Sequence, residues 1–166
     1  IQVYNQSGQT LSNLVGQQGS ITGMAITPDS SFLITSSDDQ TIRVWDTKLL
    51  GKQNVIYPTA SIFIAKNSEW VIWNEDGYFT ASKKGASYVG YHVNQGADKE
   101  AKFYPFEQFD IKYNRPDIIL QSLGVVDSSI IELYRSAYLK RLQRMGISEA
   151  DLSGTMNLPV VQLKPG

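Results

Sequence analysis

The sequence contains no cysteine and only one histidine, His92, among its 166 residues. The absence of cysteine excludes disulfide bonds, thiol nucleophiles and every zinc pattern with cysteine ligands. One histidine cannot build a histidine-rich metal centre, so we expect neither a resident metal nor a cofactor. A chain without cysteine also fits a reducing compartment, and the expected localisation is cytoplasmic.

The sequence also lacks an excess of charge and any long hydrophobic run. Fifteen Lys and Arg residues face 16 Asp and Glu residues, which gives a formal net charge of −1 at pH 7. Such a chain has no bulk field that attracts a phosphate backbone. No apolar stretch reaches the roughly 18 to 20 residues that a membrane span needs. We therefore expect neither a nucleic-acid partner nor a membrane partner.

Both ends of the sequence have the character of the interior of a structure. The chain opens without an initiator methionine or a signal-peptide pattern, on the strand-like string IQVYN. It ends with another extended run, LPVVQL, followed by Lys164, Pro165 and Gly166. These ends predict a fragment of a longer protein, in which residues 159–166 begin a further strand or linker.

An internal repeat is the clearest pattern in the first half. The string IQVYN at residues 1–5 matches IRVWD at residues 42–46, an offset of 41 residues. A period of about 40 to 45 residues is typical of a propeller blade. Four short extended runs with turn residues between them, TLSNLV, SITGMAIT, SFLITSS and TIRVW, predict one antiparallel blade. A weaker copy follows in FIAKNSEWVIWNEDGYFTAS, with a hairpin turn at Asp76-Gly77.

The stretch GQQGSITGMAITPDSSFLITSSDDQTIRVWD resembles a WD repeat in its two turns and its closing Trp-Asp pair. The resemblance implies a β-propeller blade stabilised by a network of hydrogen-bonded side chains. The matching positions here are Gln17, Thr35, Asp39 and Trp45. Gln17 stands where the family has histidine, and an amide can still donate and accept. We expect these four residues to be structural and not catalytic.

Helical patterns dominate the second half of the sequence. Alternation ends at Ser82, and the glycine-containing stretch up to residue 102 predicts an irregular connector with short extended pieces. Two short helices are predicted at Pro105 and Pro116, the second of them ending at Gly124. The strongest helical pattern covers residues 130–145, after which Gly146 ends the helix, and Ser148 with Asp151 predicts one further short turn.

The spacing of side chains on this longest helix predicts how it is capped and packed. Ser129 and Glu132 have the spacing of a capping box. Tyr134, Tyr138 and Leu142 recur on one face and are expected to pack against protein. The basic residues Arg135, Lys140, Arg141 and Arg144 form a possible interaction surface. Stabilisation of cations by the helix dipole explains the same residues, and that interpretation is favoured.

Candidate catalytic groups are sparse. A small hydrolase that uses His92 with a serine and an aspartate is the alternative from another functional class. No serine stands in a Gly-x-Ser-x-Gly pattern, however, and a histidine that bonds a backbone carbonyl in the connector is favoured. The neighbouring carboxylates Asp38-Asp39 and Glu75-Asp76 are expected to be turn residues and not an acid/base pair. The sequence therefore predicts a protein that is not an enzyme.

A second resemblance covers roughly residues 68–124. The order of EWVIWNEDGYFTAS, GYHVNQG, FYPFEQF and YNRPDIILQSLG resembles the segment that follows the propeller in bacterial proteins joining WD repeats to a caspase-like cysteine peptidase domain. The resemblance implies a non-catalytic segment that mediates protein interaction or positions domains. The His and Cys dyad of such a peptidase cannot lie in a chain without cysteine.

Together these patterns predict an α+β fold. Propeller-type antiparallel blades occupy residues 1–82, and the connector with a small helical subdomain occupies residues 83–158. A propeller needs about four to eight blades to close, whereas residues 1–82 supply only about two. The exposed blade edges are expected to recruit another copy of the chain, giving a possible homo-oligomer, or to be sheltered by the C-terminal helices; the first outcome is favoured.

Overall fold

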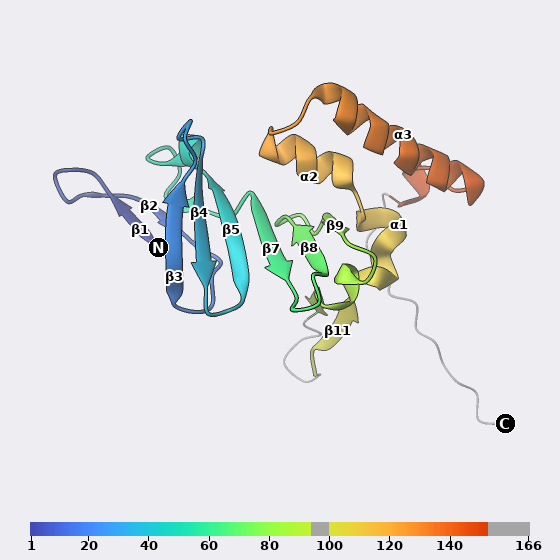
Figure 1. Cartoon of the computed structure of the whole chain (residues 1–166), viewed down its shortest axis with the longest axis horizontal. Coiled ribbons are helices and arrows are strands. Elements are labelled where there is room, and N and C mark those ends of the chain that lie inside the picture. The colour runs from blue at the N-terminus through green and yellow to red at the C-terminus, as the bar shows by residue number, and fades with distance from the viewer. Residues whose placement is uncertain (94–99, 153–166) are drawn as a thin grey trace.

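The computed structural model describes residues 1–93 and 100–152 (Figure 1). It has an α+β fold: antiparallel sheets of WD-like blades make up the first part of the chain, and the helices gather beyond one end of the main sheet (Figure 1). The partial propeller is not closed. The expected strand or linker at residues 159–166 lies outside the described residues.

The main sheet has six strands in the order β3-β4-β5-β7-β8-β9, and every neighbouring pair is antiparallel. Ser30, Gln40 and Gly77 have positive φ angles in its tight turns, and Gly77 confirms the predicted Asp-Gly hairpin. The bounds of its strands are β3 (Ile21–Ile26), β4 (Phe32–Ser37), β5 (Thr41–Asp46), β7 (Ala60–Ile64), β8 (Trp70–Trp73) and β9 (Phe79–Ala81).

A separate three-stranded sheet contains β1 (Gln2–Tyr4), β2 (Thr10–Leu14) and β6 (Val55–Ile56). The prediction that the run TLSNLV joins the same sheet as β3, β4 and β5 is therefore wrong. The short turn around Gly8 lets β2 fold back on β1, and β6 then pairs with the other edge of β2 in parallel. Sequence periodicity shows a strand here but not its pairing partner.

Two hydrophobic clusters cover one face of the main sheet. Leu33 and Trp45 from the blade pack against Leu14 and Ile56 from the three-stranded sheet. Val71 and Phe79 pack against Ala86 and Phe106 from the segment that follows the sheet. A 3-10 turn, η1 (Thr47–Leu49), adds Leu49 beside the first cluster. This face is consequently buried at both of its ends.

The region expected to be an irregular connector contains a hairpin. After the turn η2 (Gly85–Ser87), β10 (Gly90–Val93) pairs with β11 (Lys102–Pro105). A side chain at position 90 would meet the Tyr104 carbonyl oxygen at 2.3 Å, so glycine permits the close pairing. The helix predicted to start at Pro105 is wrong in its first turn, because Pro105 ends β11 and the 3-10 turn η3 (Phe106–Phe109) comes before the four-residue helix α1 (Asp110–Tyr113).

The two longer helices follow the sequence predictions closely. Helix α2 (Pro116–Leu123) has proline in its first turn and ends at Gly124, whose φ angle is 61°. Helix α3 (Ser128–Arg144) ends before Gly146, and the predicted last turn is η4 (Ala150–Leu152). The predicted capping box is wrong, because Asp127 is the N-cap residue and its side chain makes no capping bond.

The helices lie on one another and on the later strands of the main sheet. In Figure 1, α2 lies between the sheet and α3, and it contacts β7 and β9. The outer edge of β9 is covered because the Arg115 N–H donates to the Phe79 carbonyl oxygen. Within residues 1–93 and 100–152, none of the helices combines the length and hydrophobicity of a membrane span.

Candidate interaction surface

Trp45 and Thr35 form the centre of the blade. Trp45 is 1% exposed, and its indole Nε1 donates to Thr35 Oγ1 at 2.9 Å, which joins two of the four positions of the network that the resemblance implied. The two residues lie on adjacent strands of one sheet face, where β4 places Thr35 and β5 places Trp45. A buried indole N–H needs an acceptor, so this bond fixes how the two strands pack over the first hydrophobic cluster.

Asp39 and Gln17 lie at the turn end of the same blade. The Asp39 carboxylate accepts from the backbone N–H groups of Gln18 and Thr41 and from the Thr41 hydroxyl. Burial alone would raise the pKa of Asp39, but these hydrogen bonds hold it below its ordinary value. The amide atoms of Gln17 are buried and have no hydrogen-bond partner in the described part of the chain. Among the described residues, Gln17 therefore makes no hydrogen bond to the network that the resemblance implied.

The second face of the main sheet carries a continuous set of apolar side chains, which we call the open face. The register aligns Ile34, Val44 and Ala60 in one row across three strands. A second row aligns Ile42 of β5, Ile62 of β7 and Ile72 of β8, and all three side chains are half-buried. The large apolar residues of the open face are Ile34, Ile42, Val44, Ile62, Ile64, Trp70 and Ile72.

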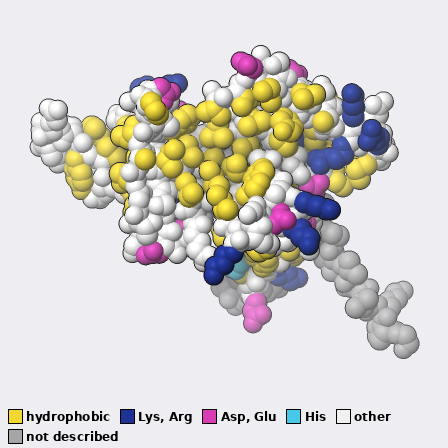
Figure 2. All heavy atoms as spheres, viewed as in Figure 1, with side chains coloured by type: hydrophobic (Ala, Val, Ile, Leu, Met, Phe, Trp, Pro, Cys, Tyr) yellow, Lys and Arg dark blue, Asp and Glu magenta, His cyan; other side chains and the backbone are white. Residues whose placement is uncertain are grey.

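No residue of the open face belongs to either buried cluster. Val44 and Ala60 are the buried positions of this face, at 8% and 0% exposure, and α2 contacts β7. Away from them, Ile64 is 59% exposed and Trp70 is 37% exposed. Figure 2 shows hydrophobic side chains gathered over the strands of the main sheet and continuing onto the helices. Contiguous apolar surface of this kind marks sites of protein contact.

Helix α3 extends this surface with its own apolar stripe. Ile130, Leu133 and Tyr134 follow helical spacing on one face and are 41%, 68% and 43% exposed. The prediction that Tyr134 packs against protein is therefore wrong, whereas Tyr138 and Leu142 are buried as predicted. The turn from α2 into α3 points Tyr138 and Leu142 inward, and Tyr134 lies on the neighbouring, solvent-facing stripe.

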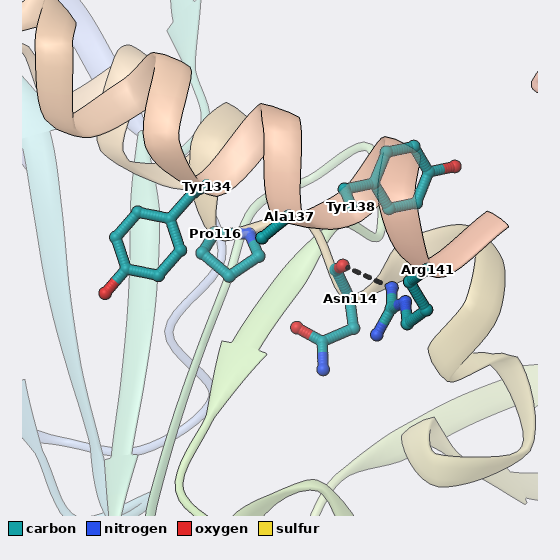
Figure 3. Close-up of a pocket in the computed structure, with 6 residues that line it drawn as sticks. All are labelled: Asn114, Pro116, Tyr134, Ala137, Tyr138 and Arg141. Carbon is teal, nitrogen blue, oxygen red and sulfur yellow. Dashed lines mark hydrogen bonds between the residues drawn. The ribbon is translucent and has the colours of Figure 1, made fainter. Parts of the chain in front are cut away.

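A hollow of about 220 Å³ separates the start of α2 from α3 (Figure 3). Pro116 and Ala137 lie in its middle, with the Tyr134 ring on one side and the Tyr138 ring on the other (Figure 3). Arg141 closes one end by donating from Nη2 to the Asn114 carbonyl oxygen at 3.1 Å. Aromatic and aliphatic side chains line most of the hollow, which forms a small notch in the apolar surface of the helices.

A buried ion-pair cluster anchors α3 to the start of α2. Arg115 donates to both carboxylate oxygens of Asp117 at 2.9 Å and 2.7 Å, and its guanidinium lies 4.1 Å from the centre of the Tyr138 ring. Glu149 adds longer ion pairs with Arg115 and Arg135. Burial alone would raise the pKa of Asp117, but the hydrogen bonds and charge of Arg115 lower it below its ordinary value. The sequence reasoning missed this pair, although Arg-Pro-Asp at a helix start was its available signal.

The four basic residues proposed as an interaction surface divide into two groups. Arg135 pairs with Glu149 and Asp117, and Arg141 pairs with Asp110 at 3.0 Å. Lys140 and Arg144 are exposed and form no ion pair with any described residue. Arg141 joins α3 to α1 through its ion pair with Asp110. Lys140 and Arg144, in the C-terminal part of α3, are the two members of this set without an ion pair to a described residue.

The groups considered for catalysis do not converge. His92 lies on β10 opposite Phe103 with an exposed side chain, and no hydrogen bond joins it to a serine, an aspartate or a backbone carbonyl of the described residues. The expected hydrogen bond from His92 to a backbone carbonyl is not found among residues 1–93 and 100–152, so it stays a prediction. Asp39 binds its own turn, while Glu75 and Asp76 are exposed in the β8–β9 turn. No set of three or more His, Asp or Glu side chains in residues 1–93 and 100–152 could hold a metal ion.

Comparison with known proteins gives a match in the part of the chain that contains the Trp45–Thr35 bond. The model of the family described as WD domain, G-beta repeat matches residues 8–46. These residues are similar to a WD repeat. The nuclear distribution protein PAC1 of Scheffersomyces stipitis is 43% identical over 42 residues, which cover 25% of this chain and 8% of that protein.

The WD repeat contains β2 to β5 and hence only part of the open face. The apolar row continues beyond it through Ile62 and Ile72 on β7 and β8. The match to a WD repeat supports a role in protein interaction or as a scaffold. The surface that could perform this role therefore extends from the WD repeat into the weaker second copy and onto the helices.

Proposed function

We propose that this chain is a non-catalytic interaction or domain-positioning segment, the end of a WD-repeat propeller in a larger multidomain protein. The open face is the observation that carries the proposal. A sheet in a globular protein buries its apolar faces against other elements. In this chain one face is covered by the two hydrophobic clusters, while the other presents Ile42, Ile62 and Ile72 half-buried.

The chemistry of the open face defines what can bind there. Its rows consist of aliphatic side chains without a charged group between Ile34 and Ile72. Such a surface suits a flat apolar partner, for example a further blade of the longer protein or the face of another domain. The free cations Lys140 and Arg144 at the far end of α3 would favour a partner with an acidic rim.

The wider setting in this proposal comes from the resemblance of residues 68–124. It comprises a bacterial source and a caspase-like peptidase domain in the same polypeptide, whereas the proposed cytoplasmic location rests on the absence of cysteine. The identity match covers 8% of its relative, so the activity and partners of the whole protein are part of the proposal. The catalytic dyad would lie in the peptidase domain, because this chain has no cysteine.

Site-specific cross-linking in the full-length protein tests the proposal. A photoreactive residue at Ile62 on the open face is compared with one at Lys52, which is exposed on the loop before β6. We expect residue 62 to cross-link to another blade or domain and residue 52 to give no such product. Equal labelling at both positions, or none at residue 62, would contradict an interaction role for the open face.

A further inference from the structure

The outer edge of β3 is the longest strand edge that the described part of the chain leaves unpaired. Strand β3 is the first in the order of the six-stranded sheet, and β4 is its single neighbour among the described residues. The opposite edge of the same sheet, on β9, is covered by Asn114 and Arg115. An uncovered edge presents N–H and C=O groups in a row and can act as a template for another strand.

The sequence of this edge carries almost none of the features that prevent edge pairing. Residues 18–27 contain no charged side chain and no proline. Met24 and Ile26 are 58% and 63% exposed on the strand. Natural edges are usually protected by charge, proline or a bulge. Here only a register irregularity between Ile21 and Gly23 and the proline at position 28 interrupt the strand, and both lie at its ends.

These two interruptions leave a regular window from Gly23 to Thr27. The Thr27 N–H donates to the Phe32 carbonyl oxygen on β4. Hydrogen-bonding direction alternates along an antiparallel strand, so residues 23, 25 and 27 bond to β4. The backbone N–H and C=O groups of Met24 and Ile26 therefore point outward, away from β4. The centre of the window is Ala25.

We propose that the β3 edge pairs with the β3 edge of a second copy of this chain, antiparallel, about a two-fold axis that passes by Ala25. Met24 then lies opposite Ile26 of the second copy, and the two residues exchange both backbone hydrogen bonds. The exposed side chains of Met24 and Ile26 cover each other in this register. No like charges meet, because the paired window is uncharged in both copies.

Ala25 suits the position on the axis. There it faces its own counterpart in a non-hydrogen-bonded pair, where the two Cα atoms approach to about 4.5 Å. A small side chain fits at this separation. The paired window is short and buries less surface than the roughly 1,200 Å² of a stable interface, so the dimer is a reversible one. This inference does not depend on the proposed interaction at the open face.

Disulfide trapping of the chain tests the register, since the natural sequence has no cysteine. In the Ala25→Cys variant the two sulfur atoms can bridge within normal disulfide geometry. In Met24→Cys the two cysteines lie diagonally, about 7 to 8 Å apart between Cα atoms. We expect Ala25→Cys to form a disulfide-linked dimer roughly tenfold faster than Met24→Cys under mild oxidation. Val55→Cys, exposed on β6, is the control for random collision.

Equal rates for Ala25→Cys and Val55→Cys would overturn the proposal, and so would faster trapping of Met24→Cys. Ala25→Glu places two carboxylates across the axis, and we expect it to abolish the concentration-dependent mass increase seen by light scattering, whereas Ala25→Ser retains it. Circular dichroism is used to check that both variants are folded. Association that survives in Ala25→Glu would show that another surface joins the copies and would also overturn the proposal.

Discussion

Trp45 contributes to stability both through its buried volume and through one hydrogen bond. It is 1% exposed and bonds Thr35. We expect Trp45→Ala to lower the free energy of unfolding by about 3–5 kcal/mol, measured by urea denaturation with circular dichroism. Trp45→Phe should cost about 1–3 kcal/mol, because Thr35 loses its buried donor.

Trp70→Ala is the matched control, since Trp70 lies on the open face with 37% exposure. We expect this change to cost much less than Trp45→Ala. If the two alanine variants unfolded at the same urea concentration, the packing of Trp45 in the blade centre would be refuted.

Asp117 makes the helical part sensitive to acid. Its pKa in the folded chain lies below the ordinary value of about 3.9, so the unfolded chain binds a proton first as the pH falls. The stabilisation is complete above the unfolded pKa and is lost as the pH falls through the folded pKa. We expect Asp117→Asn to cost about 3–5 kcal/mol at neutral pH, because buried Arg115 loses its bidentate carboxylate and keeps only the longer ion pair with Glu149.

Urea denaturation at a series of pH values measures this effect. The natural chain should lose stability between about pH 5 and the folded pKa, and Asp117→Asn should show a flatter profile over the same range. Glu149 is more exposed, with its side chain at 41%, and Glu149→Gln is the control expected to change the profile little. Parallel profiles for the natural chain and Asp117→Asn would contradict the prediction.

At the scale of elements, α3 has one buried face and one free face. Leu142 is 2% exposed, whereas Leu133 on the same helix is 68% exposed. We expect Leu142→Ala to destabilise the chain by about 2–5 kcal/mol and Leu133→Ala to change stability by no more than about 0.5 kcal/mol. The identical substitution in one helix removes differences in helix propensity. Similar losses in thermal unfolding would show that α3 is not packed through Leu142.

Local signals predicted the elements well and their partners poorly. Pro116, Gly124 and Gly146 placed the ends of α2 and α3, because their backbone preferences act within a few residues. Strand β2 was predicted as a strand, but its pairing with β6 depends on segments far apart in the sequence. Tyr134 shares its helical period with buried residues, and only the position of α2 decides that it is exposed. The resemblance likewise placed Gln17 in the network by its position in the sequence, but its amide makes no hydrogen bond to the described residues.

At the scale of the whole molecule, the open face was the feature hardest to read from the sequence. Strand β5 has apolar side chains on both faces, Ile42 and Val44 on one and Trp45 on the other. This pattern is typical of a strand covered on both sides. The sequence therefore contained the signal for two apolar faces, but only the arrangement of the elements shows that the second one is covered at Val44 and Ala60 and open beyond them.

The pairing of β2 with β6 has a consequence for the order in which the molecule assembles. Ser12 Oγ donates to the Gln53 carbonyl oxygen, 41 positions later in the chain, and the Val15 N–H donates to the Ile56 carbonyl oxygen. The β4–β5 hairpin closes a far shorter loop and loses less chain entropy. Long-range parallel contacts of this kind form late and open first. Native-state hydrogen exchange should accordingly show the Val15 amide exchanging through a partial opening that detaches the three-stranded sheet, while the Val44 amide exchanges only through global unfolding. Equal exchange free energies at the two amides would instead mean that both sheets melt as one cooperative unit.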